Sequence, residues 1–282
     1  MRTRLFLLWL SLTLSVHVAA AAGDAPVPCP DEPAELAPGL IARDIGDGAH
    51  VVTHSIPVPC NALLVEMPDG TLVLAGSTWT ADATQQLLDW AHAKWGERPI
   101  VAINTGYHVD NLGGNHALRL AGIPIHGSEL TARLLAENGD RQRALLLRML
   151  GGEAAPDYAL HAANAYDPPT HRFALAEGLT LHFGGEEVRV IFPGHTQASD
   201  KVVVYFPSRR LLFGGCAVVG GPRLGNLAEA DLQAWRRAIR RLAELPCDVV
   251  VPGHSPRLDA GVLQHTQRLL TDALSVPMPP RE

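Results

Sequence analysis

The chain has 282 residues, which is enough for one large α/β domain or two small ones. Its composition is ordinary for a globular protein, with 47% hydrophobic and 18% charged residues and a formal net charge of −6. A mildly acidic chain has no excess of basic residues to neutralise phosphates, so we expect no nucleic-acid partner. One group of arginines recurs at helical spacing and indicates the solvated face of a helix: Arg236, Arg237, Arg240 and Arg241.

The N-terminus has the pattern of a secretion signal. Residues 1–4 are positively charged, residues 5–16 are mostly apolar, and residues 18–22 supply small side chains for cleavage. The apolar run is short for a membrane-spanning helix, which disfavours a membrane anchor. We expect export to the periplasm as a monomer, with no membrane attachment after cleavage. The expected divisions are a signal peptide over 1–22, a mature N-terminal arm over 23–44 and the main domain over 45–282.

The first half of the main domain alternates apolar runs with turn signals. Thr80 is placed to cap a helix whose apolar face carries Ala83, Leu87, Leu88 and Ala91. Turn residues at 68–70 predict a hairpin between the two runs that they separate. The predicted strands of this half are 50–56, 62–67, 71–75 and 99–103.

The middle of the chain is less regular. Residues 118–121 predict a short helix and residues 123–125 a short edge strand. Residues 128–150 have a helical pattern, with a break expected at Asn138-Gly139-Asp140. Residues 151–172 are rich in Pro, Ala and Asn and predict a long loop.

The second half repeats strands followed by helices. Strands are predicted at 179–183, 188–192, 202–206, 211–213 and 249–251, the first two forming a hairpin around Gly184-Gly185. Helices are predicted around Leu232 to Leu242 and Val262 to Leu270. Two β-rich halves, each covered by helices, predict an α/β fold built as a four-layer αβ/βα sandwich.

Five residues that can bind metal follow apolar strands in similar loops. They are His108, Asp110, His195, Cys216 and His254. Glycine directly precedes the last three, so each of those loops can turn tightly. A single histidine is more often a hydrogen-bonded core or surface residue, but five such residues in repeated strand–loop contexts indicate a zinc site.

Four cysteines are present. Cys216 is the candidate metal ligand, and the other three indicate different roles. Cys29 and Cys60 could pair in an oxidising compartment, although spacing alone does not decide the pairing. Cys247 opens an apolar run and indicates a small buried core residue.

The chain resembles the metallo-β-lactamases, in the branch whose zinc site includes a cysteine. The likeness runs from about residue 50 to the end and is closest in Gly76–Thr80, Asn104–Asn115 and Pro193–Trp235. It implies zinc and hydrolysis of a β-lactam amide by the domain at 45–282. It also implies that Asp110, Cys216 and His254 hold one zinc ion, with His108 and His195 as ligands of a second site.

The departures from the family pattern bear on that second site. Gly106 stands where the family's first histidine would be, so we expect the second site to be weak or empty. Gly76 stands where the di-zinc subclass has a supporting Asp, and Val219 stands where the family often has a Lys that binds the substrate. Arg223 could replace that lysine, and Asn226 matches the residue thought to polarise the lactam carbonyl.

The resemblance therefore implies a zinc-dependent β-lactamase with mixed features of the di-zinc subclass and of the mono-zinc, carbapenem-selective subclass. His108, Asp110 or His195 would act as the general base. Two alternatives remain open on the sequence: a zinc hydrolase of the same fold that acts on a thioester or lactone, and a periplasmic zinc-binding protein with little catalysis.

Overall fold

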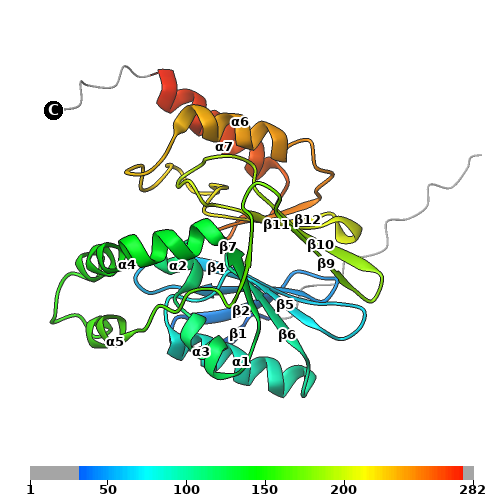
Figure 1. Cartoon of the computed structure of the whole chain (residues 1–282), viewed down its shortest axis with the longest axis vertical. Helices are drawn as coiled ribbons and strands as arrows, with labels where there is room; N and C mark the ends of the chain where they lie inside the picture. The colour runs from blue at the N-terminus through cyan, green and yellow to red at the C-terminus, as the bar shows by residue number, and fades with distance from the viewer. Residues whose placement is uncertain (1–31, 276–282) are drawn as a thin grey trace, which may run out of the picture.

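The computed structural model describes residues 32–275, which form two β-sheets packed face to face (Figure 1). The predicted signal peptide and Cys29 lie outside the described residues. The first sheet has the strand order β1 to β8. Its strands are antiparallel up to β5 and parallel from β5 to β8. The bounds are β1 Ala34–Ala37, β2 Leu40–Asp44, β3 Ala49–His54, β4 Cys60–Glu66, β5 Leu72–Ala75, β6 Ile100–Ile103, β7 Ile125–Ser128 and β8 His171–Phe173.

The second sheet has the order β13-β12-β11-β10-β9. All its neighbours are antiparallel except β12 and β13, which run parallel. The bounds are β9 Leu179–Phe183, β10 Glu186–Ile191, β11 Val203–Phe206, β12 Leu211–Gly215 and β13 Val249–Pro252. A 3₁₀ turn, Pro207–Arg209, joins β11 to β12.

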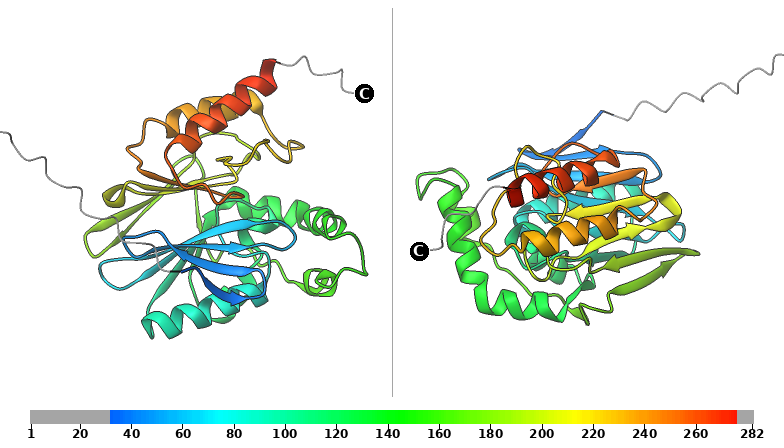
Figure 2. Two further views of the ribbon diagram at one scale, coloured as in Figure 1. Left: turned by 180° about the vertical axis from the view of Figure 1, so that it is seen from behind. Right: turned by 90° about the horizontal axis from the view of Figure 1, so that it is seen from above.

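Helices cover the outer face of each sheet, as two further views show (Figure 2). Residues of α1 pack on the first sheet in one apolar cluster, and residues of α6 and α7 pack on the second sheet in another. The αβ/βα sandwich expected from the sequence is therefore confirmed. The bounds are α1 Ala81–Trp95, α2 Val109–Leu112, α3 Asn115–Leu120, α4 Glu129–Met149, α5 Tyr158–Ala163, α6 Leu232–Leu242 and α7 Gly261–Ser275.

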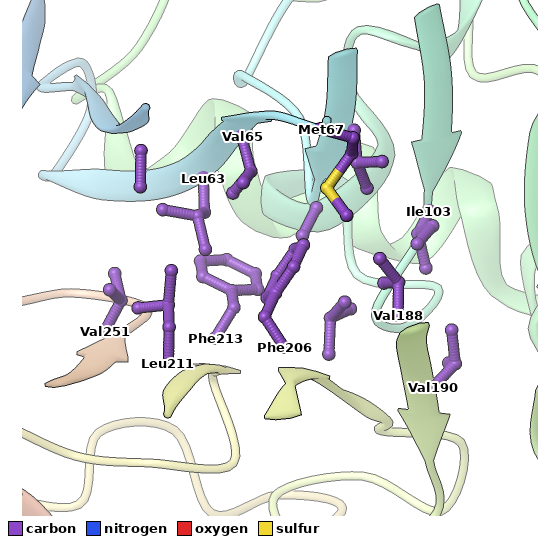
Figure 3. Packing of buried hydrophobic residues seen from close by; sticks show 14 of the residues in the cluster. Leu63, Val65, Met67, Ile103, Val188, Val190, Phe206, Leu211, Phe213 and Val251 are labelled. Atoms are coloured by element: carbon purple, nitrogen blue, oxygen red, sulfur yellow. The ribbon is translucent and has the colours of Figure 1, made fainter. Parts of the chain in front are cut away.

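The main core lies between the two sheets. Leu63 and Val65 of β4, and Met67 directly after it, point toward Phe206 and Phe213 of the facing sheet (Figure 3). All five are at most 2% exposed. Burial of a side chain of this size contributes roughly 1.5–3 kcal/mol, so this layer fixes how the sheets face each other.

The structure corrects the prediction at four places. The first is the expected N-terminal arm, whose residues 34–44 form β1 and β2. Leu40 and Ala42 are buried against β3, but the flanking Pro38 and Gly39 hid this alternation. The folded region therefore begins before residue 45.

The other three corrections concern the middle of the chain. The predicted loop over 151–172 contains α5 and the start of β8. Because β8 pairs with β7, the strand predicted at 123–125 is not at the sheet edge. The predicted break at 138–140 is absent, since α4 runs from Glu129 to Met149 with Ser128 as its N-cap.

No helix within residues 32–275 has both the length and the apolar character needed to cross a membrane.

The unbroken course of α4 predicts that Gly139→Ala stabilises the protein. A Cβ at Gly139 would meet only Leu135, at an ordinary contact distance of 3.4 Å. Alanine in a helix interior is favoured over glycine by about 0.5–1 kcal/mol, and urea unfolding should show a gain of that size. The matched control is Gly151→Ala just beyond the helix, where φ is +89° and the same change should destabilise. A loss of stability in Gly139→Ala would show that α4 is interrupted there.

Candidate functional site

The site forms where three loops leave the ends of strands. Asp110 lies in the first turn of α2, shortly after β6, while Cys216 directly follows β12 and His254 comes two residues after β13. Gly215 pairs with Pro252 across the parallel strands, so the two following loops emerge side by side. A Cβ at Gly253 would lie 2.8–2.9 Å from the backbone of Gly215 and Cys216, which is why glycine is needed there.

The three predicted zinc ligands meet at one point. Asp110 Oδ2 lies 3.0 Å from His254 Nε2 and 3.2 Å from Cys216 Sγ. The sulfur and the imidazole nitrogen are 3.4 Å apart. Asp110 and Cys216 are buried, and all three residues line one cavity. Residues more than a hundred positions apart in the sequence are thus brought within contact of one another.

Neighbouring groups fix the direction of two of the three donors, His254 and Asp110. His254 Nδ1 donates to the carbonyl oxygen of Pro59 at 2.8 Å, which leaves Nε2 to face the cluster. The side-chain amide of Asn111 donates to Oδ1 of Asp110, the carboxylate oxygen that points away from His254. Such supporting bonds orient metal ligands before the metal binds.

Asp110 and His254 each favour the charged form of the other. Burial alone would raise the pKa of Asp110. The hydrogen bond from His254 opposes this, as do the charges of Lys201 and His108, and the pKa is held far below its usual range. Burial would lower the pKa of His254, but the charge of Cys216 and the bond to Asp110 raise it well above its usual value.

A second thiol, which the sequence did not indicate as a ligand, reaches the same place. Cys60 opens β4, and its Sγ donates to the backbone oxygen of Asp110 at 3.2 Å. Ligand atoms of Cys60, Asp110 and His254 lie within 4.8 Å of one another. Cys60 is a buried free thiol, and its proposed partner Cys29 lies outside the described residues. Burial, with the charges of Asp110 and Cys216, raises the pKa of Cys60 well above its usual value.

The donor set of Asp110, Cys216 and His254 fits zinc. One imidazole nitrogen, one carboxylate oxygen and one sulfur are all common zinc ligands. They converge from fixed positions, and three protein ligands leave one position of a tetrahedral ion open for water or substrate.

The other two predicted ligands meet at a different residue, Glu229. His108 Nε2 lies 3.2 Å from Glu229 Oε2, and His195 Nε2 donates to the backbone oxygen of Glu229 at 2.8 Å. The hydroxyl of Tyr107 and the guanidinium of Arg141 also donate to this carboxylate. The hydrogen bond from His108, helped by that from Tyr107, lowers the pKa of Glu229 to about 2. Glu229 lies in an irregular segment before α6, and nothing in the sequence pattern marked it.

A cavity of about 280 Å³ opens above the zinc ligands. The helix α4 forms one wall with Gln142, Leu145, Leu146 and Met149. The segment from Val219 to Asn226 lines it as well, and it includes Arg223 and Asn226, the two predicted substrate-binding residues. His195 is not among the residues that line this cavity within the described chain.

The geometry predicts that Cys216→Ser weakens zinc binding by on the order of a hundredfold or more, because a hydroxyl replaces the thiolate ligand. Competition with a chromophoric chelator measures the affinity. The comparison is Cys247→Ser, which removes a thiol that lies outside the cluster. Full zinc retention in Cys216→Ser would exclude Cys216 as a ligand.

Comparisons with known proteins show which family the chain belongs to. A family model described as the Metallo-beta-lactamase superfamily matches residues 55–254. Two proteins named Metallo-beta-lactamase type 2, from Bacillus cereus and Bacillus sp. (strain 170), are each 31% identical over 217 residues, covering 76% of this chain and 73% of theirs. A solved structure, the metallo-beta-lactamase from Pontibacter korlensis, is 32% identical with a TM-score of 0.69, covering 83% of this chain and 99% of that one. The chain belongs to the metallo-β-lactamase superfamily.

Proposed function

We propose that this protein hydrolyses the β-lactam amide bond of antibiotics, using a zinc ion held by Asp110, Cys216 and His254. The observation that carries the proposal is the convergence of these three donors at the floor of a cavity large enough for a small molecule. The relatives of similar length that carry the name Metallo-beta-lactamase type 2 support the choice of substrate.

Zinc bound to these residues would supply Lewis-acid chemistry at the amide that is cleaved. A proton must also be taken from the attacking water. Of the three predicted bases, His108 and Asp110 line the cavity, and His108 is the better candidate because Asp110 is a proposed zinc ligand. When His108 donates Nε2–H to Glu229, its lone pair lies on Nδ1, where a proton can be accepted. The carboxylate of Glu229 orients this imidazole. Asp110 and His195 remain candidates for the same role.

Arg223 and Asn226 would hold the substrate. A guanidinium pairs with a carboxylate, and β-lactam antibiotics carry one next to the ring. The amide of Asn226 would donate to the lactam carbonyl, where negative charge develops during attack. Val219, which stands where a lysine is common in the family, presents an apolar side chain to the cavity instead.

The wall formed by α4 supports a preference for carbapenems. Leu145, Leu146 and Met149 bring apolar side chains against the cavity, which limits the room beside the bound ring. Carbapenems have small substituents there, whereas many penicillins and cephalosporins have bulky ones. We further propose that one zinc ion is bound, that the His108/His195 site is weak or empty, and that the mature protein is a periplasmic monomer.

The test is hydrolysis of imipenem and benzylpenicillin by the mature protein, titrated from zero to excess zinc. We expect turnover of imipenem that is highest at one zinc ion per chain, with little turnover of the penicillin. Turnover of both drugs that rises to a second equivalent would contradict carbapenem selectivity and the single zinc ion. No turnover of any β-lactam would overturn the proposed activity. Assays with thioesters and lactones would then separate another hydrolase from a zinc-binding protein.

A second prediction concerns Arg223. Arg223→Ala should raise KM for imipenem about tenfold with a smaller change in kcat, since a charged hydrogen bond contributes about 1.5–3 kcal/mol and this side chain is exposed. The matched control is Arg237→Ala on the exposed face of α6, which should leave both constants unchanged. Equal kinetics in the two variants would remove Arg223 from the substrate site.

A further inference from the structure

The segment Val219–Asn226, which we call the substrate segment, carries both residues proposed to bind the antibiotic. Three of its eight residues are glycine, which gives a free backbone wide conformational freedom. Arg223 is exposed, and its guanidinium makes no hydrogen bond or ion pair within residues 32–275. The place of this charge at the cavity therefore depends on how the backbone of the segment is held.

Two adjacent residues of α7, on the outer face of the second sheet (Figure 2), hold the start of the substrate segment. The backbone N–H of Val219 donates to Thr266 Oγ1 at 2.9 Å, and the same hydroxyl lies 3.0 Å from the carbonyl oxygen of Val219. His265 Nε2 donates to the carbonyl oxygen of Gly221 at 2.7 Å. Thr266 is 0% exposed, so its hydroxyl is a fixed partner shielded from water. These contacts tie two backbone positions of the segment to one helix.

The start of the substrate segment also lies against the loop that presents a zinc ligand. A Cβ added to Gly220 would lie 2.6 Å from both Cβ and Oγ of Ser255, the residue directly after His254. The two backbones are therefore in direct contact at this point. Because α7 holds the residues on either side of Gly220, it also fixes where the segment starts relative to the proposed zinc ion.

Beyond Gly221 the backbone of the segment is much less restrained. None of the N–H groups of residues 223–226 has a hydrogen-bond partner in the part of the chain that the structure describes. Leu224 packs, partly buried, on the apolar cluster that contains Val262 and Leu263 of α7. Arg223 is thus only two residues from the last backbone bond to α7, and that helix is its nearest support.

We propose that His265 and Thr266 are positioning residues: they hold the substrate segment, and thereby hold Arg223 where it meets the carboxylate of the substrate. The proposal rests on the proposed function for the role of Arg223. Neither residue lines the cavity, so within the described chain both act through the backbone at Val219 and Gly221.

The physical effect is preorganisation. A segment that is already held does not have to be ordered when the substrate binds, which favours binding. The zinc ligands and His108 are held by other contacts, so loss of the α7 contacts should weaken substrate binding more than the chemical step. If these contacts only stabilised the fold, their loss would lower the thermal stability and leave KM of the folded enzyme unchanged.

The first experiment measures how firmly the segment is held, without a β-lactam. Arg223 is the one trypsin site between Arg210 and Arg236, so fragments that end at Arg223 report cleavage within the segment. We expect cleavage about fivefold faster in His265→Leu, the change that corresponds to one net hydrogen bond. His265→Gln keeps an N–H donor at a similar reach and should restore the wild-type rate. The control Gln264→Leu, at an exposed position of the same helix, should also match the wild type.

The second experiment measures imipenem kinetics in the same variants. His265→Leu should raise KM about three- to fivefold with little change in kcat, and His265→Gln should rescue KM. Thr266→Val should act in the same direction, whereas Thr266→Ser keeps the hydroxyl and should resemble the wild type. Adding His265→Leu to Arg223→Ala should raise KM no further than Arg223→Ala alone, because the anchor then has no guanidinium to hold. Zinc affinity should be the same in all these variants.

Two results would overturn the proposal: cleavage at Arg223 at the wild-type rate in His265→Leu, or faster cleavage with an unchanged KM. Circular dichroism checks that each variant folds. Amide hydrogen exchange in the wild-type protein needs no variant: Val219 should exchange much more slowly than Arg223, and equal rates would show that α7 does not hold the segment. If the wild type hydrolyses no β-lactam, the proposed function fails, while digestion and exchange still decide whether α7 holds the segment.

Discussion

A buried carboxylate stays charged only when positive charge and hydrogen bonds surround it, and Asp110 is the residue on which this constraint acts most strongly. Its position between His254, Lys201 and His108 keeps the pKa far below the usual range in spite of burial. The same arrangement makes the site ready for a cation. The metal site and the buried charge network are therefore one structure, and a change at any of these residues alters the electrostatics of the others.

The sandwich makes this network possible because it brings the ends of two sheets together. The apolar layer around Phe206 and Phe213 sets the spacing of the sheets (Figure 3). Asp110 comes from the loop after β6 of one sheet, and Cys216 and His254 follow two parallel strands of the other. A shift between the sheets would separate the carboxylate from the other two donors. Packing between the sheets thus controls the distances of about 3 Å between Asp110 and the other two donors.

Sequence patterns predicted what depends on local order. The layers of the fold and the five candidate metal-binding residues were predicted because each of these residues follows an apolar strand. The grouping of Asp110, Cys216 and His254 into one site came from the resemblance to the metallo-β-lactamases. The pattern did not predict Lys201, Glu229 or Cys60 as parts of the site, because their positions depend on how distant segments meet. The break expected in α4 was also wrong. Asn138, Gly139 and Asp140 are weak helix formers, but Leu135 and Leu146 on either side of them are buried, and such packing outweighs local propensity.

The glycine at position 106 has a different meaning once its neighbour is considered. On the sequence alone, Gly106 marks a position where the histidine ligand of the family is missing. In the structure its missing side chain is the space that Lys201 fills, held there by backbone bonds at Tyr107 and Val202. A Cβ at position 106 would lie 2.7–2.8 Å from the outer atoms of Lys201, so a larger residue there would require the lysine side chain to move. The two positions are therefore mutually dependent, so restoring a histidine at 106 alone would disturb Lys201 before it could add a metal ligand.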